Sequence, residues 1–188
     1  MLISPDKHYT FADVLTWPED AHIELIEGVP FQLPKRSRIH QEICRRLGLS
    51  LWKYMEDKPG EVFFMPLSTR LFEKDGDTPE GVDTYVEPDI IVICDPSKLD
   101  DIGCKGAPDL IIEILSPSSK RHDLVTKFNL YRWAGVREYW IVDPDGKTVQ
   151  TYILENGYYI AGDLASPGDK LPVNVLDGCV VDLAQVFS

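Results

Sequence analysis

The sequence predicts an α/β fold in which helices flank a central mixed β-sheet. Residues 90–94 and 110–115 are the most apolar runs of the chain, as expected for central strands that are covered on both faces. Helical and strand patterns alternate around these runs, and this order is typical of helices packed on a mixed sheet. The 188 residues, 44% of them hydrophobic and 27% charged, suffice for one packed domain over residues 1–188.

The first elements are expected to be a short helix and a β-hairpin. The helix is predicted over residues 11–17 and ends at a proline. Strands are predicted over residues 22–26 and 29–33, on either side of Glu27-Gly28. A two-residue junction of this kind closes a tight hairpin, so an N-terminal hairpin is expected.

A long helix is expected to begin at Ser37 and to end before Pro59. Strands follow over residues 62–64 and 69–72, and the acidic stretch over residues 73–87 is expected to be an exposed loop because glycine and proline interrupt it. One helix face is apolar at every third or fourth position, at Ile39, Ile43, Leu47, Leu51 and Tyr54.

A second helix is expected after the 110–115 strand. Ser118 or Ser119 can cap it, and it runs to Ala134, where Gly135 stands in the position of a left-handed C-cap. Three more strands complete the order, and the last two form a C-terminal hairpin: residues 137–142, 149–154 and 157–160.

The charge of the chain limits its partners. With 31 acidic against 19 basic residues the formal net charge is −12, which repels nucleic-acid backbones and anionic membranes at long range. A nucleic-acid partner therefore requires a local basic patch or a bridging metal ion. No window approaches the roughly 20 apolar residues of a membrane span, and the N-terminus lacks a signal-peptide pattern, so a cytoplasmic protein without a membrane partner is expected.

Three charged residues interrupt the apolar pattern. Glu113 lies in the middle of one apolar run, where an unpaired carboxylate costs several kcal/mol, and Asp89 opens the other run. On a helical wheel, Lys127 falls at the border of the apolar face, from which its ammonium group can reach the sheet. Two carboxylates beside a lysine can hold Mg²⁺, although a purely structural ion pair is the alternative. The apolar face of that helix is predicted to comprise Leu124, Val125, Phe128 and Tyr131.

Residues 88–144 resemble the signature region of the Uma family of restriction endonucleases, within the PD-(D/E)XK nuclease superfamily. The similarity continues upstream through IELIEG at residues 23–28 and His40. The resemblance implies a restriction-endonuclease-like sandwich fold. It also implies an endonuclease that hydrolyses phosphodiester bonds of DNA with Mg²⁺ or Mn²⁺.

The same resemblance assigns candidate site residues. Asp89 matches the PD carboxylate and Glu113 the (D/E) position, which makes both metal ligands, and Glu24 matches an acidic position that supports the site. Leu115 stands where the motif places its lysine. Lys127 matches a variant of the motif in which the following helix supplies that lysine. If Lys127 does not replace the missing lysine, the alternative is a nuclease fold that no longer cleaves nucleic acid and acts as a nucleic-acid-binding or interaction module.

The sequence also contains a second Pro-Asp pair and one cluster of basic residues. Asp109 follows Pro108 at the start of the other apolar run and is interpreted as a strand-entry residue.

Because two-fold dimers are the commonest assemblies, a homodimer is expected. The basic cluster is predicted to contact the DNA backbone, with a solvated surface as the alternative, and comprises Lys35, Arg36, Arg38 and His40. Aromatic residues expected in the core are Trp133, Tyr139 and Trp140.

Overall fold

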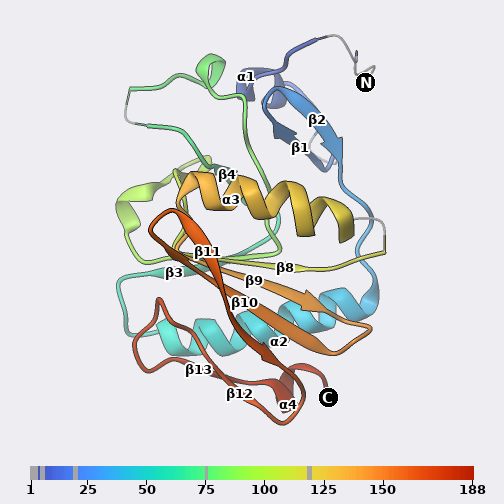
Figure 1. Cartoon of the computed structure of the whole chain (residues 1–188). Coiled ribbons are helices and arrows are strands. Elements are labelled where there is room, and N and C mark those ends of the chain that lie inside the picture. Colours follow the sequence, from blue (N-terminus) through green and yellow to red (C-terminus); the bar gives the residue numbers. More distant parts are fainter. Residues whose placement is uncertain (1–3, 5–6, 19–20, 75, 118–119) are drawn as a thin grey trace.

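The computed structural model describes residues 4, 7–18, 21–74, 76–117 and 120–188 of the chain. It confirms a central mixed sheet flanked by helices (Figure 1). The six strands of this sheet lie in the order β11-β10-β9-β8-β5-β3. Their bounds are Glu61–Phe64 (β3), Ile90–Ile93 (β5), Leu110–Ile114 (β8), Glu138–Asp143 (β9), Thr148–Glu155 (β10) and Tyr158–Ala165 (β11).

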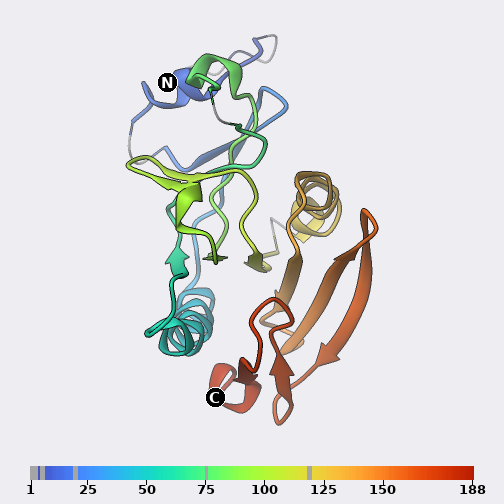
Figure 2. The ribbon, with the colours of Figure 1, turned by 90° about the vertical axis from the view of Figure 1, so that its left-hand side faces the viewer.

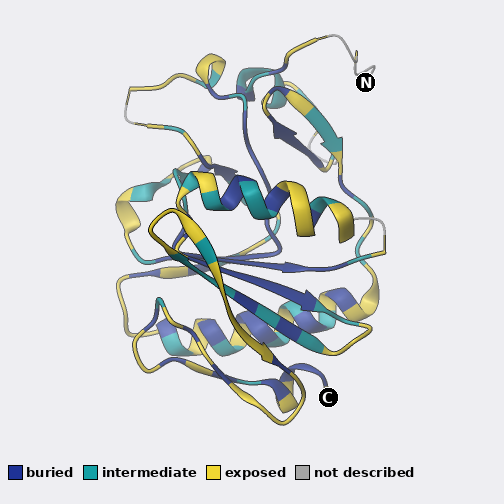
Figure 3. Cartoon of the chain, viewed as in Figure 1, coloured by how far each residue is buried: buried dark blue, intermediate teal, exposed yellow. Residues whose placement is uncertain are grey.

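The two most apolar strands lie side by side at the centre of the sheet. β5 pairs with β8 in antiparallel orientation, and β8 pairs with β9 in parallel orientation, which is the one parallel pair among the described strands of this sheet. Successive side chains point to opposite faces, so Ile90 and Val92 belong to one hydrophobic cluster and Ile91 and Ile93 to another. Both faces of these strands are therefore buried, as the apolar runs predicted (Figure 3).

Helices cover the two faces of the sheet. The long helix α2 (Arg38–Met55) packs on one face together with the C-terminal segment, and α3 (Phe128–Ala134) packs on the other (Figure 2). Ser37 caps α2, since its side chain accepts a hydrogen bond from the His40 backbone N–H at 3.2 Å. Gly135 ends α3 with a φ of 90°, the left-handed C-cap that the sequence predicts.

The segment before α3 corrects the predicted helical face. A π-helical segment, η3 (His122–Lys127), precedes α3. Its wider turn changes the angular spacing of the residues that it contains, so Leu124 and Val125 are 38% and 54% exposed while Asp123 and Lys127 are buried. Lys127 thus lies within the buried face rather than at its border. The predicted caps, Ser118 and Ser119, lie outside the described residues.

The N-terminal part forms the predicted helix and hairpin above the central sheet (Figure 1). The helix α1 (Phe11–Val14) is shorter than expected, and β1 (Ile23–Ile26) and β2 (Val29–Gln32) pair in antiparallel orientation. Glu27 and Gly28 have φ angles of 49° and 74°, as a two-residue hairpin turn requires.

Other elements differ from the expectation or were not predicted. The strand expected over residues 69–72 is β4 (Ser68–Arg70), which lies in a separate three-stranded sheet, β4-β7-β6, because Thr69 bonds Val86 and Cys104 lies beside it. Trp133 is 63% exposed and does not belong to the core, whereas Tyr139 and Trp140 do. Elements absent from the sequence prediction are the short helices η1 (Pro79–Gly81) and η2 (Pro96–Lys98), the strands β6 (Leu99–Asp100), β7 (Gly103–Lys105), β12 (Lys170–Pro172) and β13 (Val180–Asp182), and the helix α4 (Leu183–Val186).

None of the helices within the described ranges combines the length and the apolar character that crossing a membrane requires.

Replacing Gly48 in the middle of α2 by alanine is expected to destabilise the protein. A Cβ atom at Gly48 would lie 1.9 Å from Cε1 of Phe64, so the ring of Phe64 must move. Overpacking of this kind costs about 1–3 kcal/mol, more than the roughly 1 kcal/mol that alanine gains in helix propensity. Urea unfolding of wild type and Gly48→Ala measures the difference.

Two controls separate the clash from the helix propensity. Ser50→Ala, on the same helix, should leave stability unchanged or slightly raise it. In a Phe64→Ala background the clash is gone, so Gly48→Ala should become stabilising there. A stability gain for Gly48→Ala in the wild-type background would contradict the predicted contact.

Candidate active site

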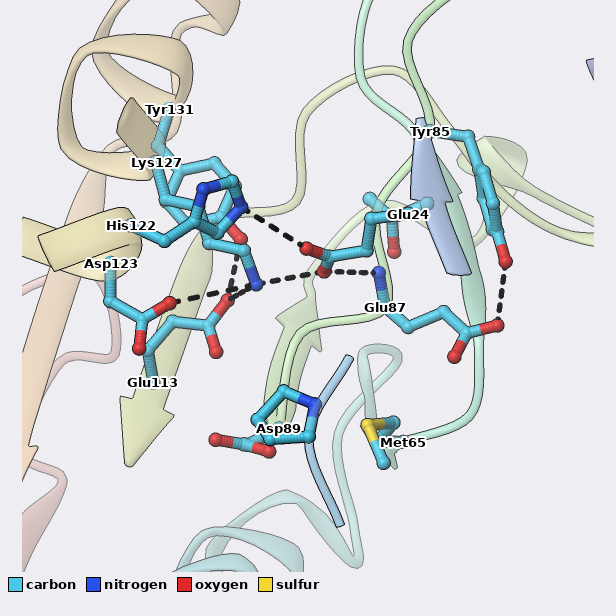
Figure 4. A network of polar contacts seen from close by, with 12 residues as sticks. Glu24, Met65, Tyr85, Glu87, Asp89, Glu113, His122, Asp123, Lys127 and Tyr131 are labelled. Carbon is cyan, nitrogen blue, oxygen red and sulfur yellow. Dashed lines mark hydrogen bonds and ion pairs between the residues drawn. The ribbon is translucent and has the colours of Figure 1, made fainter. Parts of the chain in front are cut away.

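Glu113 is a buried carboxylate near the C-terminal end of β8, on the face that α3 covers. Its side chain is 2% exposed. Its Oε1 accepts a hydrogen bond from Nζ of Lys127 at 2.8 Å and another from the hydroxyl of Tyr131 at 2.6 Å. Both donors come from the helical segment after β8, so the helix supplies the countercharge for the strand (Figure 4).

Lys127 bridges two buried carboxylates. Its Nζ lies 2.7 Å from Oε1 of Glu24 on β1 and 2.8 Å from Oε1 of Glu113. The same oxygen of Glu24 accepts a hydrogen bond from the backbone N–H of Glu87 at 3.0 Å, and Nε2 of His122 lies 3.6 Å from the other oxygen. One ammonium group thus ties the N-terminal hairpin, the central sheet and the segment before α3 to one point.

Asp89 lies directly before β5 and is held from three sides. Its Oδ1 accepts a hydrogen bond from Nε of Arg36 at 3.1 Å. Its Oδ2 accepts one from the backbone N–H of Ile114 at 2.8 Å and lies 3.0 Å from Nε2 of His40. Burial opposes ionisation of this carboxyl, but His40 and Arg36 outweigh burial and hold the pKa of Asp89 below its usual value.

Glu24 and Glu113 share a single cation, the ammonium group of Lys127. Burial would raise the pKa of Glu24, yet Lys127, His122 and the Glu87 amide lower it to about 2. Burial, helped by the charge of Asp89, raises the pKa of Glu113 to about 8 against the opposing effect of Lys127. Glu113 is therefore the carboxyl of this site that favours its protonated form, and a bound cation can take the place of that proton.

Lys127 itself stays protonated. Burial alone would lower the pKa of its ammonium group, but Glu113 and Glu24 reverse that effect and raise the pKa above its usual value. Lys127 therefore carries a permanent positive charge in the folded protein.

The side chains around Lys127 open into a cavity of about 170 Å³. Asp89 and Glu113 both line it, together with Arg36 and Lys127. A groove of about 700 Å³ lies next to this cavity along α2, and Arg36 and Asp89 line both hollows. The groove and the cavity therefore meet at Arg36 and Asp89.

The donor set fits a hard cation with few protein ligands. Within the parts of the chain that the structure describes, no three His, Cys, Asp or Glu side chains are arranged as a ready metal cluster. Asp89 and Glu113 nevertheless line one cavity, and the raised pKa of Glu113 shows that its anionic form lacks sufficient countercharge. Mg²⁺ is commonly held by one or two carboxylates with water and substrate phosphate completing its shell, so these two residues suffice for such an ion.

Comparison with known protein families decides where the chain belongs. The model of the Uma2 family, described as "Putative restriction endonuclease", matches residues 11–184. The chain belongs to the Uma2 family. The matched range includes the whole network from Glu24 to Tyr131.

This Uma2 chain is also similar to one curated protein and to one solved structure. It is 26% identical over 132 residues to an uncharacterized protein of Synechocystis sp., a match that covers 69% of this chain and 62% of that protein. It shares its fold, with a TM-score of 0.72 and 23% identity, with a crystal structure described as "a putative nuclease belonging to DUF820" from Anabaena variabilis. That similarity covers 95% of this chain and 97% of the other.

The structure brings together the four residues that the resemblance marked in this Uma2 chain. Glu24, Glu113 and Lys127 are in direct contact, and Asp89 lies on the same cavity. Their roles as ligands and catalytic groups stay predictions. Asp109 lies apart, where it accepts a hydrogen bond from the Cys94 backbone N–H at 2.8 Å, as a strand-entry residue would.

The predicted basic cluster divides into two pairs. Arg36 and His40 point inward to Asp89, and both are largely buried. Arg38 pairs with Glu42 on the surface, and Lys35 is exposed. Contact of these four residues with DNA stays a prediction for the Uma2 chain.

Sequence reasoning missed three members of the network. The helical wheel puts Asp123 and Tyr131 beside Lys127, but the sequence gives neither a role in the site, and it does not single out His122. His122 and Asp123 lie in the π-helical segment η3, and Tyr131 lies in α3. The sequence signal that could have found them is the dense run of polar and aromatic residues around Lys127.

Proposed function

We propose that this Uma2 chain is a Mg²⁺- or Mn²⁺-dependent endonuclease that hydrolyses phosphodiester bonds of DNA. The observation that supports it is the meeting of Asp89, Glu113 and Lys127 on one cavity, within a chain of a family described as restriction endonucleases. In this proposal Asp89 and Glu113 hold the metal ion. Glu24 supports the site by holding Lys127 in place at 2.7 Å.

The metal ion would supply a water of lowered pKa and a positive charge on a phosphate oxygen. Lys127 contributes a second positive charge. Because Glu24 and Glu113 keep it protonated, it cannot take a proton from water, but it can stabilise the negative charge that develops on the phosphate. The Arg36 guanidinium and His40 orient Asp89, whose pKa stays low so that it remains an anionic ligand.

The position of Lys127 favours a cutting enzyme over the alternative of an inactive binding module. That alternative was suggested by Leu115 at the usual lysine position. Leu115 is 7% exposed and belongs to the hydrophobic cluster under α3, while Nζ of Lys127 reaches Glu113 from the following helix. An ammonium group is therefore present beside the carboxylate without a lysine on the strand.

Cleavage of supercoiled plasmid tests the proposal. Wild type should nick or linearise the plasmid with Mg²⁺ or Mn²⁺ and lose this activity in EDTA. Asp89→Asn removes the anionic ligand but not its shape, so cleavage should fall by about a hundredfold or more. The measurement is the initial rate of loss of supercoiled DNA.

Asp109→Asn is the matched control, because Asp109 is a buried aspartate after a proline but lies outside the cavity. The asparagine oxygen can still accept the hydrogen bond from Cys94. This variant should cleave like wild type. Equal loss in both variants, or equal activity in all three proteins, would refute the assignment of Asp89.

A further inference from the structure

The groove along α2 has a lining of mixed character. Arg38 and Arg45 on α2 provide positive charge, and Leu49, Phe64 and Met65 provide apolar surface. Leu49 is 48% exposed and Phe64 is 38% exposed, so both present apolar surface to solvent. The groove ends at Arg36 and Asp89, where the proposed catalytic cavity begins.

Arg45 is an uncommitted cation on this surface. Glu42 forms ion pairs with Arg38 at 2.8 Å and with Arg46 at 3.1 Å. No such partner of Arg45 occurs within the described ranges, and the residue is exposed. On a chain of net charge −12, a free arginine beside the proposed active site attracts anions locally.

Phe64 presents a partly exposed aromatic ring beside α2. It ends β3, the edge strand of the sheet, so no further strand of that sheet covers it. Its ring lies so close to the backbone of α2 that a Cβ at Gly48 would meet it at 1.9 Å. Glycine at this position therefore lets the ring pack on the helix, one turn from Arg45 and next to Leu49.

We propose that this groove binds a single strand of nucleic acid, with phosphates on Arg38 and Arg45 and an unstacked base on Phe64; the inference rests on the proposed endonuclease function. Unpaired bases expose apolar faces that stack on aromatic side chains, and such binding tolerates any sequence. A duplex hides these faces and presents mainly phosphates. Duplex binding needs many phosphate contacts, for which a groove with one unpaired arginine on an acidic chain is poorly suited.

Fluorescence anisotropy with labelled oligothymidine of about 20 nucleotides, longer than the site of a typical single-strand binding fold, tests the inference. The competitor is a duplex of the same length, and Ca²⁺, another hard oxygen-binding cation, replaces Mg²⁺. Electrophoresis checks that the oligonucleotide stays intact. Wild type should bind the single strand about tenfold more tightly than the duplex. Phe64→Ala should weaken single-strand binding about fivefold or more, by loss of one stacked base.

Arg45→Glu should weaken the same binding about tenfold, and more at low salt than at high salt. Lys53→Glu is its matched control, since Lys53 is an exposed lysine of α2 outside the groove lining, and this variant should bind within about twofold of wild type. Equal affinity for duplex and single strand, or wild-type binding by Phe64→Ala, would overturn the inference. So would a change from dimer to monomer in Phe64→Ala without loss of binding, because the surface would then bind a second copy of the chain.

The plasmid assay keeps this inference separate from the proposed function. If wild type cuts DNA in a metal-dependent manner but does not prefer single strands, the groove inference fails and the endonuclease stands. If the groove variants lose binding while no protein cuts, the groove binds a strand and the endonuclease fails.

Discussion

Replacement of Lys127 by methionine is expected to destabilise the protein by about 3–5 kcal/mol, the cost of removing one partner from a buried ion pair. The ammonium group lies between Glu24 and Glu113, and all three side chains are at most 2% exposed. Methionine fills a similar volume, so the loss is electrostatic rather than a cavity. The buried carboxyl groups of Glu24 and Glu113 would lose their shared countercharge, and Glu24, which Lys127 keeps ionised, would lose most. Urea unfolding at neutral pH measures this cost.

Two further variants show whether charge is the cause. Lys120→Met removes an exposed lysine near the same helix, which pairs with Asp143 at 3.4 Å, and should change stability by less than about 1 kcal/mol. Combining Lys127→Met with Glu24→Gln and Glu113→Gln removes the ion pair as a whole and should recover most of the lost stability. If the triple variant were as unstable as Lys127→Met alone, the packing around Lys127 rather than its charge would determine the result.

The buried charges made the candidate site predictable. Glu113 stands inside an apolar run, where packing offers no reason for a carboxylate, so the sequence marks it without any structure. Lys127 is found by the same reasoning, since a buried acid requires a cation nearby. The central strands were equally predictable, because β5 and β8 are covered on both faces and their sequences show it.

Contacts between distant segments were not predictable in the same way. Arg36 and His40 lie 53 and 49 positions from Asp89, and no local pattern records that they converge on it. The inner face of η3 could not be predicted, because an α-helical period was assumed where the backbone forms a π-helix. The strands β12 and β13 are three residues each, too short to give a periodic signal.

Glu113→Gln is expected to lose cleavage by at least about a hundredfold, as loss of a charge that acts on the reacting group does, without loss of stability. The glutamine oxygen can still accept the hydrogen bonds that Lys127 and Tyr131 donate to Glu113. The negative charge, which burial and the neighbouring acids oppose, is removed. Replacement of a carboxylate that serves only stability would lower stability and leave cleavage unchanged. Loss of cleavage without loss of stability therefore identifies Glu113 as a functional carboxylate.

The pH dependence of the free energy of unfolding shows whether the charge of Glu113 stabilises or destabilises the fold. The pKa of Glu113 is raised from 4.5 to about 8 in the folded protein, so the folded state binds a proton that the unfolded state has released. This group therefore stabilises the fold most at low pH, and its contribution declines as pH rises from about 4.5 to 8. Glutamine does not titrate, so the stability of Glu113→Gln relative to wild type should increase across this window. Urea midpoints at both ends of the window measure it, and a variant that becomes relatively less stable as pH rises would show that Lys127 holds Glu113 as a stabilising anion.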